Sequence, residues 1–223
     1  MYHLSSLHTG NVGLTTTTHM KIIKSDAIQI TILDKSWDLT KKVRRENSTR
    51  VEGFVNNLRK VNYYSGIDPE TVTHIYEKAN LDLCLVKVDG ARGKLIKSAA
   101  DYEPVLPTYF HSFIPVVSAK AVGRRLTKKI AHRPELISKI TGLKAGETIS
   151  TNHIAKLIAH PDGLLKGSGS AVVVPVITMV DDDILSNHAM EISETALDLT
   201  DRFDRIVLYS RKNAGLVKLV VRQ

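Results

Sequence analysis

The chain has 223 residues, 43% of them hydrophobic and 24% charged, so it can bury the core of one α/β domain. No apolar run approaches the roughly 20 residues that a membrane-spanning helix requires, and we expect no signal peptide. The single cysteine, Cys84, excludes an internal disulfide and favours a cytoplasmic location. The net charge of +8 indicates a polyanionic ligand or partner, such as the phosphates of a nucleotide or an acidic protein surface.

Positive charge is spread along the chain rather than gathered in one segment. Its densest patches lie at residues 41–45 and 124–129. Neither patch is interleaved with aromatic side chains, on which proteins stack the bases of single-stranded nucleic acids. Aromatic residues make up only 5% of the chain. A nucleic-acid partner is therefore supported by net charge alone and is not favoured.

The chain begins with the pattern of a short helix followed by a strand. Leu4 and Leu7 share one face of the helix predicted at residues 1–9, which Gly10 ends. Residues 11–18 then predict a strand that ends in four consecutive threonines. Their hydroxyls either face phosphate or metal, or simply form a Thr-rich strand end. Because a βαβ unit needs a strand before its helix, we expect the domain to be N-terminally incomplete.

Strands and helices alternate along the rest of the chain. This alternation favours an α/β fold with a mostly parallel sheet and helices on both faces. We expect a single domain over residues 1–223, with a small helical insertion at about 120–168, and a polar loop or short exposed helix at 37–49. The expected strands lie at residues 28–33, 60–64, 83–88, 113–118, 171–180, 205–209 and 216–221, and the expected helices at 51–58, 69–79, 132–141, 150–160 and 184–199.

The strand predicted at residues 83–88 organises the chain. It is almost continuously apolar, which is typical of a strand buried on both faces, and it stops at Asp89. Ligands of open α/β sheets bind at the carboxyl ends of strands, where an acid is well placed to hold Mg²⁺. A solvated Asp-Gly turn is the alternative. Two following glycines, Gly90 and Gly93, allow close backbone approach to an anion, and two basic residues, Arg92 and Lys94, supply positive charge.

A second apolar strand, at residues 171–180, also stops at an acid, Asp181. We expect Asp89 and Asp181 to meet at a common edge of the sheet, as in nucleotide-binding sheets. The phosphate-binding sequence G-x-x-x-x-G-K-[ST] is missing. A chain with this architecture either binds no triphosphate or is an incomplete copy of one that does.

Several motifs resemble those of one known family. Val-Asp-Gly-Ala-Arg-Gly at residues 88–93 and Tyr-Glu-Pro-Val-Leu-Pro at 102–107 resemble the family segment EADGARG…KAPAEHEPVIP, and residues 15–20 resemble TTTTKM. The likeness covers roughly residues 1–210. Further matching segments lie at residues 97–99, 132–135, 141–143 and 160–167. The chain is similar in these motifs to the YqeC family, described as selenium-dependent molybdenum hydroxylase accessory proteins.

The resemblance implies a P-loop NTPase-like fold that binds Mg²⁺ and ATP or GTP. In that arrangement Asp89 holds the metal, while Thr17 and Thr18 face the metal or the γ-phosphate. Arg92 or Lys94 meets phosphate charge, and Asp181 contacts the base. Four further residues lie in the family-like segments and are expected to line the site without an assigned step: His132, Arg133, His160 and Lys166.

The chain departs from the family pattern in two places. Members usually open with a strand and a GAGGKTT-type loop, and residue 1 of this chain falls just after that loop. Members also tend to have an NKVDD-like segment that reads the base, where this chain has Thr178 and Met179 instead of Asn and Lys. Asp181 is kept, but guanine selectivity through this segment loses its support.

The resemblance implies a cytoplasmic, nucleotide-binding maturation factor, possessing NTPase activity in its full-length form. Its expected partners are a selenium-dependent molybdenum hydroxylase or other maturation factors of that enzyme, and no membrane. The alternative is a non-catalytic adaptor that binds a partner protein through a basic surface. A nucleotide-dependent rise in melting temperature separates the two.

Overall fold

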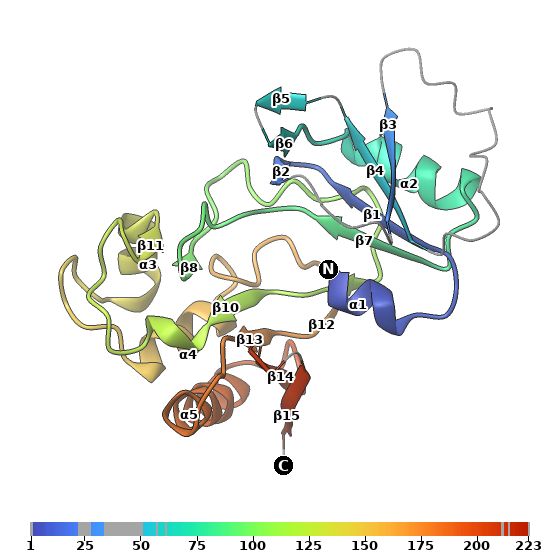
Figure 1. Ribbon diagram of the computed structural model, residues 1–223. Helices are drawn as coiled ribbons and strands as arrows, with labels where there is room; N and C mark the ends of the chain where they lie inside the picture. The colour runs from blue at the N-terminus through green and yellow to red at the C-terminus, as the bar shows by residue number, and fades with distance from the viewer. Residues whose placement is uncertain are drawn as a thin grey trace. The chain divides into compact units, whose positions relative to one another are not determined.

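The computed structural model describes residues 2–21, 28–33, 51–56, 58–60, 62–210, 212–213 and 215–222. The basic patch at 41–45 and the segment expected to be polar at 37–49 lie outside these residues. The protein is an α/β protein with several mostly parallel sheets. It divides into two compact units (Figure 1). Unit 1 comprises Met1–Gly90 and Val105–Tyr109, and unit 2 comprises Ala91–Pro104 and Phe110–Gln223.

Unit 1 is built on a parallel four-stranded sheet in the order β3-β4-β1-β7 (Figure 1). Its strands are β1 (Val12–Thr16), β3 (Gln29–Leu33), β4 (Val51–Asn56) and β7 (Leu83–Lys87). The short helix α1 (Tyr2–Leu7) precedes β1, and α2 (Pro69–Lys78) precedes β7. Three short antiparallel strands complete the unit: β2 (Met20–Lys21), β5 (Leu58–Lys60) and β6 (Tyr63–Tyr64).

Side chains of this sheet alternate between two apolar clusters, as the period of two along a strand requires. On one face Val72 and Ile75 of α2 pack with Phe54. The opposite face carries Val12 and Leu14. Helix α2 therefore covers one face of the sheet and fixes the strands whose carboxyl ends carry the predicted site residues.

Two predictions for unit 1 are wrong. Residues 51–58 were expected to be helical, but Val51–Asn56 is strand β4, buried between β1 and β3. Its β-branched and aromatic residues pack on both sheet faces, and this tertiary context decides the conformation. The strand at 83–88 was expected to be buried on both faces. Among the described strands, however, β7 is an edge strand of its sheet, and its residues are half-buried.

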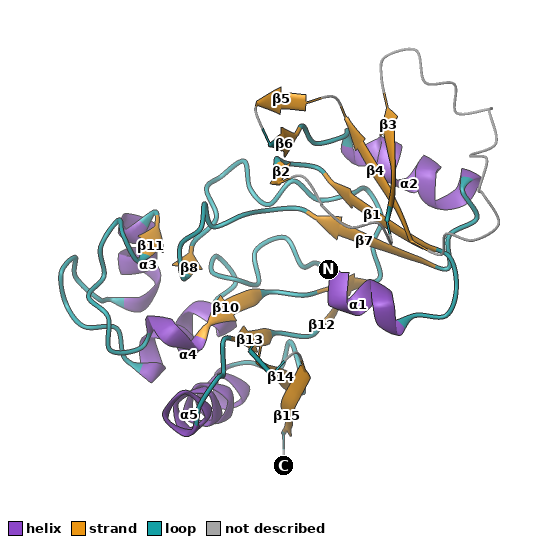
Figure 2. Cartoon of the chain, viewed as in Figure 1, coloured by secondary structure: helices purple, strands orange, loops and turns teal. Residues whose placement is uncertain are grey.

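Unit 2 contains a second four-stranded sheet in the order β10-β13-β14-β15. β10 (Val116–Ser118), β13 (Val176–Thr178) and β14 (Arg205–Ser210) are parallel, and β15 (Gly215–Val221) is antiparallel to β14. Two smaller parallel pairs join β8 (Ile96–Lys97) to β11 (Ala131–His132) and β9 (Ser112–Phe113) to β12 (Val172–Val173). The helices of this unit are η1 (Ala119–Ala121), α3 (Pro134–Thr141), α4 (Thr151–Ala159) and α5 (Asp183–Leu199) (Figure 2).

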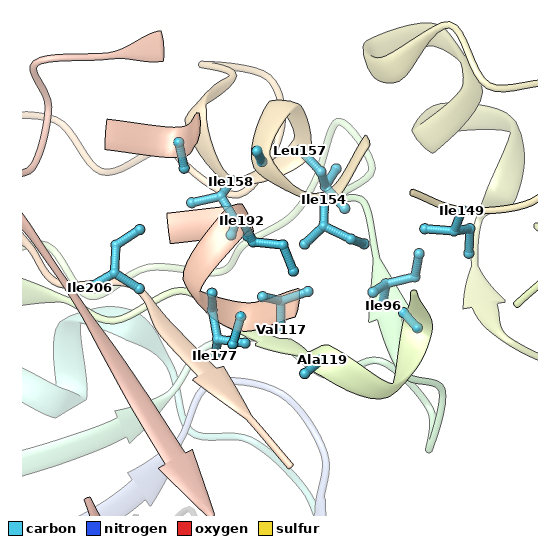
Figure 3. Close-up of a cluster of buried hydrophobic side chains, with 14 of the residues drawn as sticks. Ile96, Val117, Ala119, Ile149, Ile154, Leu157, Ile158, Ile177, Ile192 and Ile206 are labelled. Carbon is cyan, nitrogen blue, oxygen red and sulfur yellow. The ribbon is translucent and has the colours of Figure 1, made fainter. Parts of the chain in front are cut away.

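The core of unit 2 is a continuous apolar cluster formed by helices and strands together (Figure 3). Ile154 and Ile158 of α4 lie close to Ile192 of α5, above Val117 and Ile177 of the sheet (Figure 3). These five side chains are at most 3% exposed. Helices α4 and α5 thus cover the sheet face that carries Ile177. Ser150 caps α4 in a capping box with His153.

Two prolines interrupt the strands predicted at 113–118 and 171–180. Pro115 separates β9 from β10, and Pro175 separates β12 from β13. Proline has no N–H to donate to a neighbouring strand. Both prolines still accept hydrogen bonds, Pro115 from Val176 N at 2.8 Å and Pro175 from Val207 N at 2.9 Å. Each of the two predicted strands is therefore two shorter ones.

The prediction of one sheet with a common acidic edge is also wrong. β7, before Asp89, and β13, before Asp181, belong to different sheets in different units. The expected helical insertion at about 120–168 contains α3 and α4 of unit 2, and the single-domain assignment stays a prediction. None of the described helices is both long enough and apolar enough to cross a membrane.

Candidate functional site

Consecutive threonine hydroxyls mark the carboxyl end of β1. Thr15 and Thr16 are fully buried and donate hydrogen bonds to the carbonyl oxygens of Phe54 (2.7 Å) and Lys87 (2.8 Å). Thr17 donates to the carbonyl oxygen of Val105 at 2.5 Å. The first two hydroxyls therefore tie β1 to its neighbours β4 and β7. They are structural and face backbone carbonyls, not a ligand.

Thr18 differs from the other three threonines because its hydroxyl meets a cation. The Nζ of Lys87 donates to Thr18 Oγ1 at 2.9 Å and to the carbonyl oxygen of His19 at 2.8 Å. The backbone N–H of Thr18 donates to Thr16 Oγ1 at 3.1 Å. Lys87 is the last residue of β7, so its ammonium spans the carboxyl ends of two parallel strands. This is the edge at which open α/β sheets bind ligands.

The Asp89–Gly90 turn lies just beyond the carboxyl end of β7, after Val88. Gly90 N donates to Asp89 Oδ1 at 2.6 Å. A Cβ added to Gly90 would lie 3.2 Å from Lys87 Nζ, so the missing side chain leaves the ammonium room on that side. Backbone, ammonium and carboxylate are thus gathered at one strand end. We call Thr18, Lys87, Asp89 and Gly90 the strand-end site.

The strand-end site suits phosphate better than an isolated metal ion. Within the described part of the chain, no three His, Cys, Asp or Glu side chains come together as a metal-binding group. The Lys87 ammonium beside Thr18 would repel a cation at that hydroxyl. Mg²⁺ in nucleotide sites is held by one or two carboxylates together with phosphate oxygens. A single carboxylate, Asp89, therefore fits a metal ion only where phosphate oxygens supply further ligands.

Unit 2 begins at Ala91, and it therefore contains Arg92, Gly93 and Lys94. Both Arg92 (φ 51°) and Gly93 (φ 76°) adopt left-handed backbone conformations. The turn is closed by a hydrogen bond from Lys94 N to the carbonyl oxygen of Ala91 at 2.9 Å. The side chain of Arg92 is exposed.

Asp181 lies at the carboxyl end of β13 in unit 2. Lys120 Nζ donates to its Oδ2 at 2.6 Å, and Ser210 Oγ donates to its Oδ1 at 3.0 Å. The hydrogen bond from Lys120 holds the pKa of Asp181 below its ordinary value, and burial acts in the opposite direction. Both carboxylate oxygens thus already have partners within the sheet edge. A base contact by Asp181 stays a prediction.

His132 and Arg133 lie in a charged cluster of unit 2 centred on Glu103. Arg133 donates to both carboxylate oxygens of Glu103, at 2.7 and 3.0 Å, and Lys97 forms a second ion pair with it. Burial raises the pKa of Glu103, but hydrogen bonds from Arg133 and Lys97 outweigh it and lower the pKa to about 2. Burial lowers the pKa of His132, and the charges of Arg133, Lys97 and Arg92 lower it further.

Lys166 reaches the same loop of unit 2. Its Nζ donates to the carbonyl oxygen of Ala100 at 2.7 Å. His160 ends α4, and its Nδ1 accepts a hydrogen bond from Asp162 N at 3.0 Å. That bond shapes the turn before Lys166. Of the predicted residues in unit 2, the structure therefore brings Arg133 and Lys166 to one loop, with His132 beside it, and gives His160 a local role.

Sequence reasoning missed three charged residues. Lys87 was treated as part of an apolar strand, Lys97 as a motif residue, and Glu103 as part of an extended segment. The one available signal for Lys87 was a lysine interrupting an apolar strand two residues before the acid. Lys97 and Glu103 are six residues apart, and no periodicity indicates that their side chains meet.

The fold and this edge define an α/β protein with polar and charged groups at the carboxyl ends of parallel strands. Comparison with known families identifies the family of this α/β protein. The family described as "YqeC protein" matches residues 1–135, more than half of the chain. The chain therefore belongs to the YqeC family.

One curated relative supports this assignment. The chain is 26% identical over 155 residues to "Uncharacterized protein YqeC" of Escherichia coli (strain K12). The alignment covers 70% of this chain and 59% of the relative, so the chain spans less than two thirds of that protein's length. No solved structure matches the chain.

Proposed function

We propose that this protein is a cytoplasmic, P-loop NTPase-like accessory protein that binds a nucleotide with Mg²⁺ during maturation of selenium-dependent molybdenum hydroxylases. The observation that carries the nucleotide proposal is the strand-end site, in which Lys87 Nζ lies 2.9 Å from Thr18 Oγ1 beside the Asp89–Gly90 turn. The client enzyme is taken from what the motif resemblance implies, since the family match itself names no client.

The chemistry of the strand-end site supports binding of phosphate. The Lys87 ammonium provides a point charge, and the backbone at Gly90 lies open to it. Asp89 would complete the shell of a Mg²⁺ ion that bridges phosphate oxygens. Hydrolysis would then use a positioned water, with the charge on the phosphates neutralised by the metal ion and Lys87.

Isothermal titration calorimetry of the chain with Mg²⁺-ATP and Mg²⁺-GTP tests nucleotide binding. Lys87→Met should weaken binding by about tenfold or more, the range expected for one hydrogen bond to a charged group. Asp89→Asn should remove the Mg²⁺ dependence. The matched controls are Lys78→Met and Glu77→Gln on the exposed surface of α2, which should bind as the wild type does. Equal weakening by Lys78→Met and Lys87→Met would reject the proposal.

The role in maturation needs a cellular experiment. In a strain lacking this gene, a selenium-dependent molybdenum hydroxylase should accumulate as protein but contain little selenium and show little activity. The wild-type gene should restore both, and the Asp89→Asn gene should not. Full selenium content in the deletion strain would exclude the proposed maturation role while leaving nucleotide binding open.

An adaptor function is the second candidate, and the basic turn of unit 2 favours it. Arg124, Arg125, Lys128 and Lys129 are all exposed and form no ion pair within the described residues. An adaptor in which these four residues are changed to Ala should lose binding to the purified hydroxylase. Its binding of nucleotide should be unchanged, which separates this function from the first.

A further inference from the structure

Most of the net positive charge of the chain lies in one stretch of unit 2. Residues 121–160, all of which the structure describes, contain eight lysines and arginines and two acids, so their charge of +6 makes up most of the chain's +8. Arg133 forms an ion pair with Glu103, and the other seven basic side chains are exposed. A surface that gathers charge of one sign raises the local concentration of an oppositely charged partner.

Backbone hydrogen bonds hold five of these basic residues on one antiparallel ribbon. Its two arms are residues 123–130 and 144–149, which we call the basic ribbon. The N–H groups of Leu126 and Ile149 donate across the ribbon at 2.8 Å, and both side chains are buried in the core of unit 2. The ribbon is therefore ordered before any partner binds, which lowers the entropy cost of association.

The charged side chains of the basic ribbon are five cations and one acid. The acid is Glu147, whose carboxylate accepts a hydrogen bond from Lys144 N at 2.8 Å. The guanidinium of Arg125 donates to the carbonyl oxygen of Gly146 on the opposite arm at 3.4 Å, so this arginine lies beside the arm that carries Lys144. None of the five cations forms an ion pair within the described part of the chain: Arg124, Arg125, Lys128, Lys129 and Lys144. Their charge is therefore available to a partner.

The composition of this stretch favours one class of polyanion. Residues 121–160 contain no Phe, Trp or Tyr, so they offer no stacking platform for single-stranded nucleic acid. None of the exposed large hydrophobic side chains of the described residues lies there, so the ribbon lacks the apolar groups with which interfacial helices enter a bilayer. Glu147 would repel the continuous row of phosphates of a duplex, whereas a protein can leave a neutral or basic residue opposite it. An acidic protein surface therefore fits best.

We propose that the basic ribbon is the docking surface for an acidic segment of a partner protein, whose Asp and Glu carboxylates contact its five basic side chains. Such a surface gives the adaptor function, on which this inference rests, a partner of defined chemistry. All residues of the ribbon belong to unit 2, so docking does not require nucleotide at the strand-end site of unit 1.

Fluorescence anisotropy of a labelled polyglutamate peptide, titrated with the full chain, tests the docking surface without the client enzyme. Arg124→Ala combined with Arg125→Ala should weaken binding by about tenfold, the loss expected for two solvent-exposed charge pairs. Lys78→Ala combined with Lys218→Ala is the matched control, because it removes two exposed cations that lie outside the ribbon. The net charge falls equally in both proteins, but the control should bind the peptide within about twofold of the wild type, since distant charges are screened.

Glu147→Gln removes the one acid of the ribbon and should tighten polyglutamate binding by about twofold. Equal weakening by the two pairs of substitutions would overturn the proposal, since net charge alone would then account for binding. Tighter binding of duplex DNA than of polyglutamate at the same ionic strength would assign the ribbon to nucleic acid and would also overturn it. If the ribbon binds polyglutamate but the chain does not bind the purified hydroxylase, the docking surface is supported and the hydroxylase is excluded as its partner.

Discussion

Removal of the Glu103 carboxylate should destabilise unit 2 substantially. In Glu103→Gln the amide keeps the shape of the side chain, but Arg133 and Lys97 lose their shared negative charge. The pKa of Glu103 is lowered from 4.5 to about 2 in the folded chain. At about 1.4 kcal/mol per pKa unit, this corresponds to a ceiling of about 3 kcal/mol. Because the cluster is partly solvated, we expect a loss of about 2 kcal/mol at pH 7.

The effect should depend on pH in a defined direction. A carboxylate whose pKa is depressed by folding contributes its stability above the unfolded pKa and loses it as the pH falls towards the folded pKa. The free energies of unfolding of wild type and Glu103→Gln should therefore differ most above pH 4.5 and converge as the pH approaches about 2.

Urea denaturation of the full chain, followed by circular dichroism across this pH range, measures the difference. Asp101→Asn is the matched control, because its fully exposed carboxylate lies in the same loop. It should change the free energy of unfolding by less than about 0.5 kcal/mol. A Glu103→Gln protein as stable as Asp101→Asn at pH 7 would refute the assignment of Glu103 as the buried counter-ion.

Three further predictions concern the cores of the two units. Ile192→Ala removes a fully buried side chain of α5 and should lower the free energy of unfolding by about 2–5 kcal/mol in urea denaturation, and a loss below 1 kcal/mol would contradict the packing in Figure 3. Gly66→Ala would place a Cβ 2.3 Å from the carbonyl carbon of Thr17, so it should destabilise the chain by about 1–3 kcal/mol, and a thermally unchanged variant would contradict that close approach. Burial raises the pKa of the half-buried Cys84 thiol to about 12, so at pH 8 a disulfide reagent should modify the native chain much more slowly than the urea-unfolded chain, and equal rates would contradict this shift.

Much of the element pattern could be predicted from the sequence, because it rests on local signals. Pro69 begins α2, Ser150 caps α4, and Gly142 ends α3 in a left-handed conformation, as their residue types indicate. Asp182 likewise caps α5 through Leu185 N. Where the signal was ambiguous, as in residues 51–56, the neighbouring strands decided the outcome.

The arrangement of strands into sheets could not be predicted, since strand order depends on long-range pairing. β7 and β13 have similar apolar sequences and similar terminal acids, yet they belong to different sheets. The family resemblance correctly assigned the YqeC family. It could not indicate that the hydroxyls of Thr15 and Thr16 donate hydrogen bonds to backbone carbonyl oxygens. Nor could it show that Lys87 Nζ contacts the hydroxyl of Thr18, because side-chain contacts between strands leave no pattern in a single sequence.

The location of the proposed nucleotide site can be measured residue by residue. Backbone amide spectra of the full chain, titrated with Mg²⁺-ATP and with Mg²⁺-GTP, should show their largest shifts at Thr18, His19 and Gly90, with smaller shifts in the rest of unit 1. Lys87→Met should reduce these shifts, and Lys78→Met should not. Spectra in which these three amides stay unchanged at saturating nucleotide would contradict a phosphate site at the carboxyl ends of β1 and β7.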